Sequence, residues 1–210
     1  FLSVRAPSGD VVAYIAWNFP MGNLSMKLGA VLASGCTAVI KPATRTPLST
    51  LYIGEIMHRI GFPAGVINFV AGSAKEVSSV LTQSTIPAML TVIGSSQAGR
   101  ELIRDSATSI KRFSLELGGN APVIVTRNAD VERAATACMY GKFGNCGQVC
   151  VSPQRVFVER PVHDEFVAIA KKLADAARCG TFRDDGCNVS PMITPESVVR
   201  MEELVTDALQ

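Results

Sequence analysis

The sequence has no long apolar run, no excess of either charge and no cysteine pattern typical of a disulfide scaffold. No hydrophobic stretch approaches the roughly 18 residues that a membrane-spanning helix needs. The 20 lysines and arginines nearly balance 18 acids, so we expect neither nucleic acid nor a membrane surface as a partner. The six cysteines are irregularly spaced in a chain too long to depend on disulfides. This usage indicates a reducing compartment, and we expect the cytoplasm.

The composition indicates a globular protein. Of the 210 residues, 48% are hydrophobic, which is enough for a sizeable core in one large domain or two small ones. The chain opens on Phe1 without an initiator methionine, and Gln210 falls within a helical pattern that has no stop signal. We therefore expect a piece of a longer protein.

Short β-branched apolar runs alternate with helical patterns in the first half of the chain. We expect buried strands at 11–16, 36–40, 66–70 and 89–93, with helices at 23–34, 47–60 and 74–81 and a fourth that ends near 106. Short connections between such elements predict right-handed crossovers and a parallel sheet covered on both faces. Ligands of such sheets bind at the carboxyl ends of the strands, where four polar or flexible residues fall: Asn18, Lys41, Gly72 and Gly94.

The second half has a different pattern, with the boundary expected near Ser114. We therefore predict two parts, residues 1–114 and residues 115–210. Strands are expected at 111–117, 122–125 and 155–159, and helical spacing at 131–139, 162–178 and 196–209.

The stretch from Phe143 to Cys150 places a cysteine after a turn of small and amide residues. A thiol fixed on such a turn is exposed enough to act as a nucleophile, and nearby backbone N–H groups can face the negative charge that develops. The alternative is an inert, half-buried thiol, because free cysteine commonly packs as a small hydrophobe. This segment by itself does not decide between the two.

The segment from Gly94 to Gly99 has the glycine spacing of a phosphate-binding P-loop, but Arg100-Glu101 replaces the required Lys-Ser/Thr. The nucleotide-hydrolase interpretation is therefore excluded, and the G-x-G-x-x-G dinucleotide fingerprint is also absent. What remains is a strand entering a helix N-terminus, with Gly94 and Ser95 at the junction. Such a junction favours an anion, although a plain tight turn has the same pattern.

Three further polar residues could carry chemistry. Lys41 follows a buried strand and could hydrogen-bond a ribose or phosphate, or could be a solvated lysine. Glu116 ends a strand and could be a general base, or could pair with an arginine. Asn18 offers an amide to a developing oxyanion, or could simply form a turn.

Taken together, these stretches resemble the aldehyde dehydrogenase superfamily in order and spacing, over essentially the whole chain. The motifs that carry the resemblance are Trp17-Asn18-Phe19-Pro20, Lys41-Pro42-Ala43 with Thr46-Pro47, Gly94-Ser95, Glu116-Leu117-Gly118-Gly119-Asn120 and Gly147-Gln148-Val149-Cys150. The resemblance implies an α/β fold in which a Rossmann-like parallel-sheet domain precedes part of a second α/β catalytic domain. The likeness is greatest to the semialdehyde-oxidising branch, and it implies a homodimer or homotetramer for the full-length protein.

The resemblance also implies roles for particular residues. Cys150 would be the nucleophile that forms a thiohemiacetal and then a thioester, Asn18 and the Cys150 N–H would hold the oxyanion, and Glu116 would activate the hydrolytic water. The cofactor would be NAD or NADP, with no metal. The residues expected to bind it are Trp17, Lys41, Ala43, Thr44, Gly72, Gly94, Ser95 and Leu117.

Two departures from the family pattern bear on the ligands. Thr44 stands where many NAD-preferring members have a glutamate, and Arg45 is adjacent, so we expect NADP to be tolerated. Semialdehyde enzymes that grip a carboxylate place arginines where this chain has Met26 and Gly144. Without that bidentate clamp we expect a neutral or differently held aldehyde as substrate.

Cys146 lies four residues before Cys150 and could form a reversible disulfide with it, or could be a small residue that alanine would replace. Two other classes of function remain open from the residues themselves. One is a non-catalytic nucleotide-binding or structural module that keeps the fold. The other is a thiol esterase or acyl-transfer enzyme, which would make no use of Lys41 and Gly94.

Overall fold

The computed structural model describes all residues from Phe1 to Gln210. The chain forms two compact units, Phe1–Gly118 and Gly119–Gln210, and each is described by itself. The boundary expected near Ser114 falls inside a strand, β5 (Arg112–Leu117), which pairs with β4 (Met89–Gly94) along its whole length. Because that ladder ties β5 to the first sheet, the division lies at Gly118 and not near Ser114.

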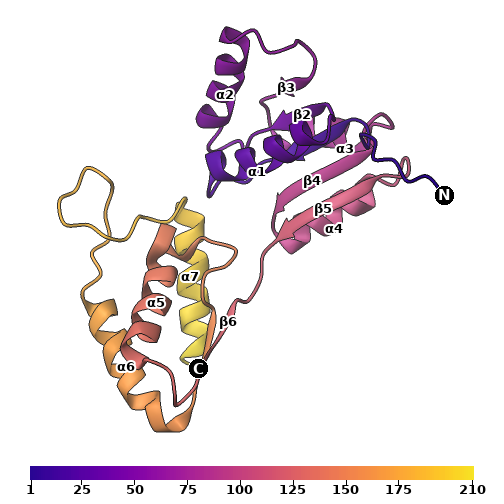
Figure 1. The fold of residues 1–210 in the computed structure, drawn as a ribbon. Helices are drawn as coiled ribbons and strands as arrows, with labels where there is room; N and C mark the ends of the chain where they lie inside the picture. The colour runs from indigo at the N-terminus through magenta and orange to yellow at the C-terminus, as the bar shows by residue number, and fades with distance from the viewer. The chain divides into compact units, whose positions relative to one another are not determined.

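The first unit contains a five-stranded sheet in the order β3-β2-β1-β4-β5 (Figure 1). Every neighbouring pair is parallel, as the alternating pattern predicts. The strands not yet given are β1 (Val11–Tyr14), β2 (Ala38–Lys41) and β3 (Ile67–Phe69). The crossover order, with β1 in the centre, places the carboxyl ends of β1 and β2 side by side at one edge of the sheet.

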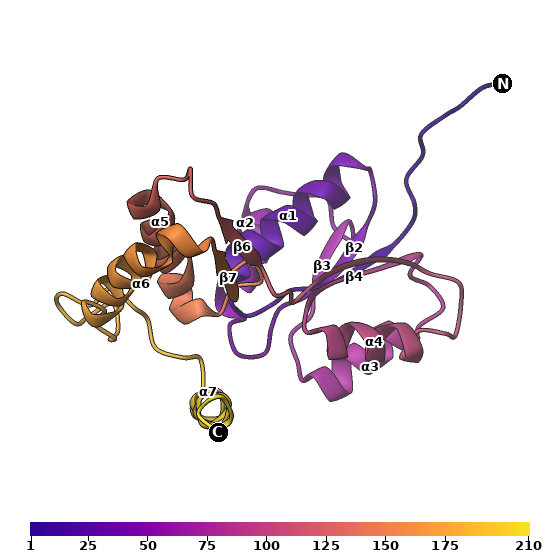
Figure 2. The same cartoon turned by 90° about the horizontal axis from the view of Figure 1, so that it is seen from below.

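Helices cover both faces of this sheet (Figure 2). One face carries α1 (Pro20–Ala33) and α2 (Leu48–Arg59), over a core that includes Ala13, Leu24 and Ile40. The other face carries a π-helical turn, η1 (Ala74–Ser78), which leads into α3 (Ser79–Gln83), and then α4 (Ser96–Asp105). The alternate residues Val12, Tyr14, Leu90 and Val92 form the core under this second layer.

α1 begins three residues earlier than the apolar pattern suggests. Pro20 occupies the first turn, where its missing N–H costs nothing, and the backbone of Phe19 is the cap. The buried positions of the helix are Asn23, Leu24, Lys27 and Val31. Their spacing of three or four residues defines a face that includes a lysine.

The second unit has a two-stranded parallel sheet of β6 (Pro122–Val125) and β7 (Arg155–Val158). Helices α5 (Val131–Phe143) and α6 (Arg160–Asp175) pack on it around a core of Val125, Val131, Ala135, Cys138 and Phe166. A 3-10 turn, η2 (Gly144–Gly147), follows α5 directly. The last helix, α7 (Pro195–Ala208), has no buried residue.

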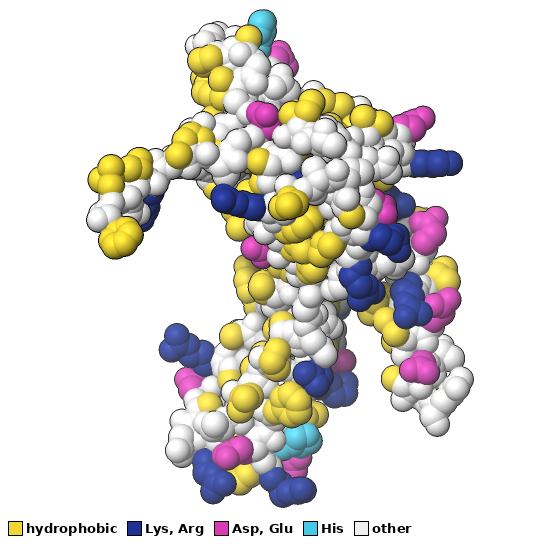
Figure 3. Space-filling view, turned by 90° about the vertical axis from the view of Figure 1, so that its right-hand side faces the viewer, with side chains coloured by type: hydrophobic (Ala, Val, Ile, Leu, Met, Phe, Trp, Pro, Cys, Tyr) yellow, Lys and Arg dark blue, Asp and Glu magenta, His cyan; other side chains and the backbone are white.

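The outer surface agrees with the balanced composition. Lysines and arginines are interspersed with acids on the face shown in Figure 3, with no continuous basic area. None of the helices combines the length and the apolar character needed to cross a bilayer.

Candidate active site

The turn that carries Cys150 has an unusual backbone. Asn145, Cys146 and Gly147 have φ values of 49°, 55° and 71°, three consecutive residues in the left-handed region. Only glycine adopts this conformation freely, and a non-glycine residue with a Cβ costs about 1–2 kcal/mol there, less for asparagine. Such strain persists only when the surroundings hold it in place, and it concentrates at functional sites.

Gln148 supplies the contacts that hold this turn. Its backbone N–H and its Nε2 both donate to the carbonyl of Asn145, at 3.1 and 2.9 Å. Its Oε1 accepts from the backbone N–H of Ile193 at 2.9 Å, 45 residues along the chain. One side chain therefore fixes the left-handed turn and ties it to the segment before α7.

Cys150 itself is exposed at the end of the turn. The parallel pairing of β6 with β7 brings the segments before the two strands together. A Cβ on Gly119 would lie 3.8 Å from the carbonyl oxygen of Cys150. Gly119 and the cysteine turn therefore meet at one end of the second unit, and Cys150 is exposed there.

Cys146 is half-buried, unlike Cys150. Burial raises the pKa of its thiol, and the nearby Cys179 raises it further. Because the thiolate is the species that reacts with peroxide or with a disulfide, this environment makes Cys146 a slow partner for Cys150.

We therefore expect peroxide to inactivate Cys146→Ser and the wild-type enzyme alike, with the same recovery under a thiol reductant. Activity measured against time in peroxide and then in dithiothreitol checks this. Faster irreversible loss in the Cys146→Ser variant would instead show that Cys146 protects the nucleophile.

In the first unit, Asn18 follows β1 at the carboxyl edge of the sheet. Its Oδ1 accepts a hydrogen bond of 3.3 Å from Asn23 Nδ2, on the first turns of α1. The adjacent carbonyl, of Trp17, accepts from the hydroxyl of Thr46 at 3.1 Å. Asn18 is thus oriented by α1 on one side and by the turn after β2 on the other.

Lys27 is a residue that the motifs do not single out. It is buried on α1, and burial lowers the pKa of its ammonium, while the negative charge of Glu116 acts in the opposite direction. Glu116 stands exposed in β5. The signal that could have found Lys27 is its spacing, since it lies four residues after Asn23 and four before Val31 on the buried face.

A cavity of about 420 Å³ opens at the carboxyl edge of the sheet, between the strand ends and the helices α3 and α4. Its floor is closed by the Tyr14 hydroxyl, which hydrogen-bonds Thr82 Oγ1 at 2.7 Å and the Ser78 carbonyl at 3.2 Å. It is lined by Tyr14, Ile15, Lys41, Pro42, Ala43, Ala74, Lys75, Ser78, Ser79, Thr82, Val92, Ala98, Glu101, Leu102 and Asp105. This volume and mixture of apolar and polar groups are typical of a small-molecule site.

Two of the predicted cofactor residues, Lys41 and Ala43, line this cavity. Lys41 is buried, its Nζ donates to the carbonyl of Pro42 at 3.2 Å, and burial lowers the pKa of its ammonium. Its head group is therefore held at the cavity wall and is not a freely solvated lysine.

The other predicted cofactor residues surround the cavity without lining it. Thr44 Oγ1 donates to the carbonyl of Gly72 at 3.2 Å, which brings those two residues together. Ser95 caps α4 by accepting from the N–H of Ala98 at 3.1 Å. Leu117 packs at the sheet against Gly99, where an added Cβ would lie only 3.0 Å from it. Gly94 is the last residue of β4, and Trp17 lies three residues after the end of β1.

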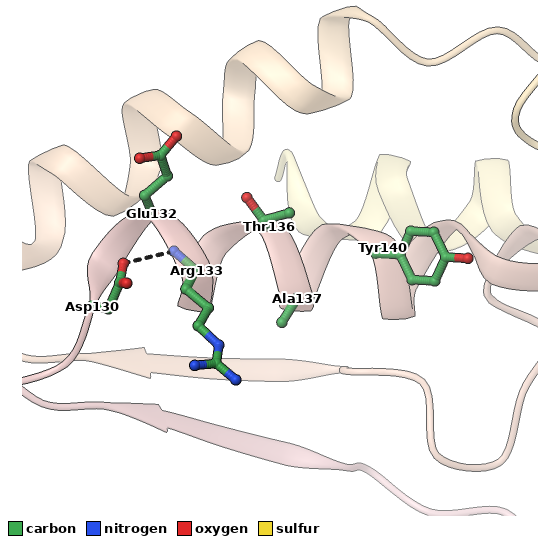
Figure 4. Close-up of a pocket in the computed structure, with 6 residues that line it drawn as sticks. All are labelled: Asp130, Glu132, Arg133, Thr136, Ala137 and Tyr140. Carbon is green, nitrogen blue, oxygen red and sulfur yellow. Dashed lines mark hydrogen bonds between the residues drawn. The ribbon is translucent and has the colours of Figure 1, made fainter.

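A second hollow of about 420 Å³ runs along α5 (Figure 4). In it the carboxylate of Asp130 caps the helix by accepting from the N–H of Arg133 at 3.0 Å. Thr136, Ala137 and Tyr140 continue along the same helix face. None of the predicted site residues lies there, so this hollow is a feature of the helix surface and is not part of the candidate site.

The model of the aldehyde dehydrogenase family matches residues 1–210, the whole chain. The chain belongs to the aldehyde dehydrogenase family. It is 40% identical over 207 residues to the succinate-semialdehyde dehydrogenase [NADP(+)] GabD of Escherichia coli (strain K12), covering 99% of this chain and 43% of that protein. The chain thus spans less than half the length of the curated relatives that it matches.

Two solved structures extend the comparison. A 3,6-anhydro-L-galactose dehydrogenase in complex with NAP has a TM-score of 0.92 and 39% identity, covering 97% of this chain and 43% of that one. A betaine aldehyde dehydrogenase from Staphylococcus aureus in complex with NAD+ has a TM-score of 0.91 and 30% identity, covering 95% and 40%. The aldehyde dehydrogenase fold predicted from the motifs is thereby confirmed.

Proposed function

We propose that the enzyme to which this chain belongs oxidises an aldehyde to a carboxylic acid with NAD+ or NADP+, using Cys150 as nucleophile. The observation that carries the proposal is the exposed Cys150 thiol, which ends a strained turn that Gln148 holds in place. Family membership and the named activity of the relative from E. coli support the same reaction class.

The first step is the capture of the aldehyde. The Cys150 thiolate attacks the carbonyl carbon, a C–S bond forms, and the carbonyl oxygen becomes an alkoxide. The amide of Asn18 and the backbone N–H of Cys150 would donate hydrogen bonds to that oxygen. These donors favour the tetrahedral alkoxide, and without it the aldehyde carbon does not release hydride.

The cofactor, when bound, accepts the hydride that leaves the tetrahedral carbon, so that a thioester remains on Cys150. Glu116 then takes a proton from a water molecule, whose oxygen attacks the thioester carbonyl. The C–S bond breaks, the acid leaves and the Cys150 thiolate returns. The net reaction converts aldehyde, oxidised cofactor and water into acid, reduced cofactor and a proton.

For the cofactor we propose dual use or a preference for NADP. The adenosine would occupy the cavity at the ends of β1 and β2, the ribose would lie beside Lys41 and the pyrophosphate would lie near the N-terminus of α4. Thr44 leaves the ribose end without a carboxylate that would repel a 2′-phosphate. Steady-state kinetics with both cofactors test this, and a preference for NAD above about tenfold in kcat/KM, or 1.4 kcal/mol, would remove it.

For the substrate we propose a neutral or differently held aldehyde. Met26 is 61% exposed on α1, and Gly144, with φ −52°, has no neighbour within 4 Å of a Cβ placed on it. Both positions have room for the arginines that the sequence lacks. A panel of neutral aldehydes and semialdehydes, assayed with both cofactors on the full-length enzyme, tests the reaction and the substrate class together.

The open positions lead to a gain-of-function prediction. The double variant Met26→Arg, Gly144→Arg should raise kcat/KM for succinate semialdehyde by about tenfold or more, because two guanidinium groups would pair with its carboxylate. The matched control is Met26→Gln, Gly144→Gln, which adds length and polarity without charge. Equal kinetics for the arginine and glutamine variants would rule out the missing clamp as the cause of the selectivity.

A further inference from the structure

Lys75 is a cation at the cofactor cavity to which the motifs assign no role. It lies on the first turn of η1 and lines the cavity, and its side chain is exposed. It takes part in none of the ion pairs of the chain. A lysine that faces a cavity without an acidic partner has an ammonium available for an anionic ligand.

Lys75 lies on the segment that follows β3 and lines the same cavity as Lys41. The hydrogen bond from Thr44 Oγ1 to the carbonyl of Gly72 fastens the turn after β2 to the segment that enters η1. Gly72 allows this approach because its φ is 153°, and Ser73 then caps η1. Lys41, at the end of β2, and Lys75, at the start of η1, both line the cavity, and Thr44 joins the two segments beside it.

The acids near Lys75 lie elsewhere or are already engaged. Glu101 and Asp105, the two acids that line the cavity, belong to α4 on the other wall, one and two turns after Ala98. Glu76, next to Lys75 in sequence, accepts from the Ser73 hydroxyl at 2.7 Å in the cap of η1. Lys41 and Lys75 are thus the two cations that line the cavity, and its two lining acids both belong to α4.

We propose that Lys75 recognises the 2′-phosphate of NADP, a role that rests on the proposed use of a nicotinamide cofactor in this cavity. Arg45, the cation nearest to Thr44 in sequence, is exposed and does not line the cavity. The 2′-phosphate of a ribose bound beside Lys41 would lie near the hydroxyl group of Thr44 and the ammonium group of Lys75. The 2′-hydroxyl of NAD would have no carboxylate to bind at this position. NAD would therefore bind without the additional contact that Lys75 makes with the 2′-phosphate of NADP.

Equilibrium binding of two cofactor fragments to the full-length enzyme tests this role apart from catalysis. The probes are 2′,5′-ADP, which carries the 2′-phosphate, and 5′-AMP, which lacks it, each titrated by calorimetry. Lys75→Gln should raise the Kd for 2′,5′-ADP by about tenfold, the usual size of a lost hydrogen bond to a charged group. It should leave the Kd for 5′-AMP within about twofold. Lys75→Arg should retain most of the affinity for 2′,5′-ADP, and Arg45→Gln is the matched control on the neighbouring turn.

Each other outcome is decisive. If Lys75→Gln leaves the affinity for 2′,5′-ADP within about twofold, or weakens both fragments equally, Lys75 does not recognise the 2′-phosphate. If Arg45→Gln causes the selective loss instead, the recognising cation is Arg45. If the wild-type enzyme binds neither fragment, the cavity is not a nucleotide site, and the proposed function fails together with this inference.

Discussion

Replacing Cys150 by serine should lower kcat by at least about a thousandfold, because a serine hydroxyl is a far weaker nucleophile than a thiolate in the absence of an adjacent base. The side chain is exposed, so the substitution leaves no cavity in the core and should not alter the stability of the second unit by more than about 0.5 kcal/mol. Formation of reduced cofactor, measured by its absorbance, reports the loss directly. Unchanged binding of 5′-AMP by the same variant would show that the cofactor cavity is intact.

The chain provides a matched control for this loss. Cys179 is also exposed but lies in the loop between α6 and α7, outside the motifs. Cys179→Ser should retain full activity, and iodoacetamide should label Cys150 in competition with aldehyde while labelling of Cys179 is unaffected by it. If Cys150→Ser kept more than about a tenth of the wild-type kcat, the nucleophile would be another group. If iodoacetamide ignored Cys150 at neutral pH, a non-catalytic nucleotide-binding module would be the better description.

The order of the elements could be predicted because the buried strands differ so clearly from the helices around them. Val11–Tyr14 and Ala38–Lys41 are short apolar runs that lead into polar or proline-containing turns, and each pairs in the parallel sheet as expected. The sequence pattern places the end of the first unit too early, because the alternation in Arg112–Leu117 resembles that of the strands in the second unit. Its pairing with β4 is a contact distant in sequence, which a local pattern does not contain.

Site residues that belong to a sequence motif could be predicted. Site residues that only the tertiary structure brings together could not. Lys41 and Ala43 were identified from their motif, and they line the cavity. Lys75 belongs to no motif, and it lines the same cavity because β3, which leads into η1, pairs with β2. Nothing in the residue types of Asn145 and Cys146 indicates that their φ angles are positive. The contact of Gln148 with Ile193 joins residues 45 positions apart, so a local pattern does not contain it. Such features arise from tertiary structure.

The second large effect is expected at Lys27, where stability and activity should change in opposite directions. Lys27→Met replaces a buried ammonium by an apolar side chain of similar length, which should raise the free energy of unfolding by about 1 kcal/mol. The same change removes the positive charge that acts on Glu116. That charge attracts the Glu116 carboxylate, which we propose takes a proton from the hydrolytic water. Without this attraction the carboxylate should be held less firmly and the thioester should hydrolyse more slowly, so we expect kcat to fall by about tenfold or more.

The pH dependence separates this explanation from simple repacking. Burial lowers the pKa of Lys27 in the folded chain below its ordinary value of 10.5. The unfolded chain therefore binds more protons between the lowered pKa and 10.5, and wild-type stability should rise with pH across that window. The advantage of Lys27→Met should be full at neutral pH and should shrink as the pH approaches 10.5, measured as the difference in urea midpoint between the two full-length proteins. The matched control is Leu32→Met, which changes an exposed residue of α1 and should alter neither kcat nor the pH profile. A stability difference that is constant with pH would mean that folding leaves the pKa of Lys27 unchanged, so that burial does not destabilise its charged form.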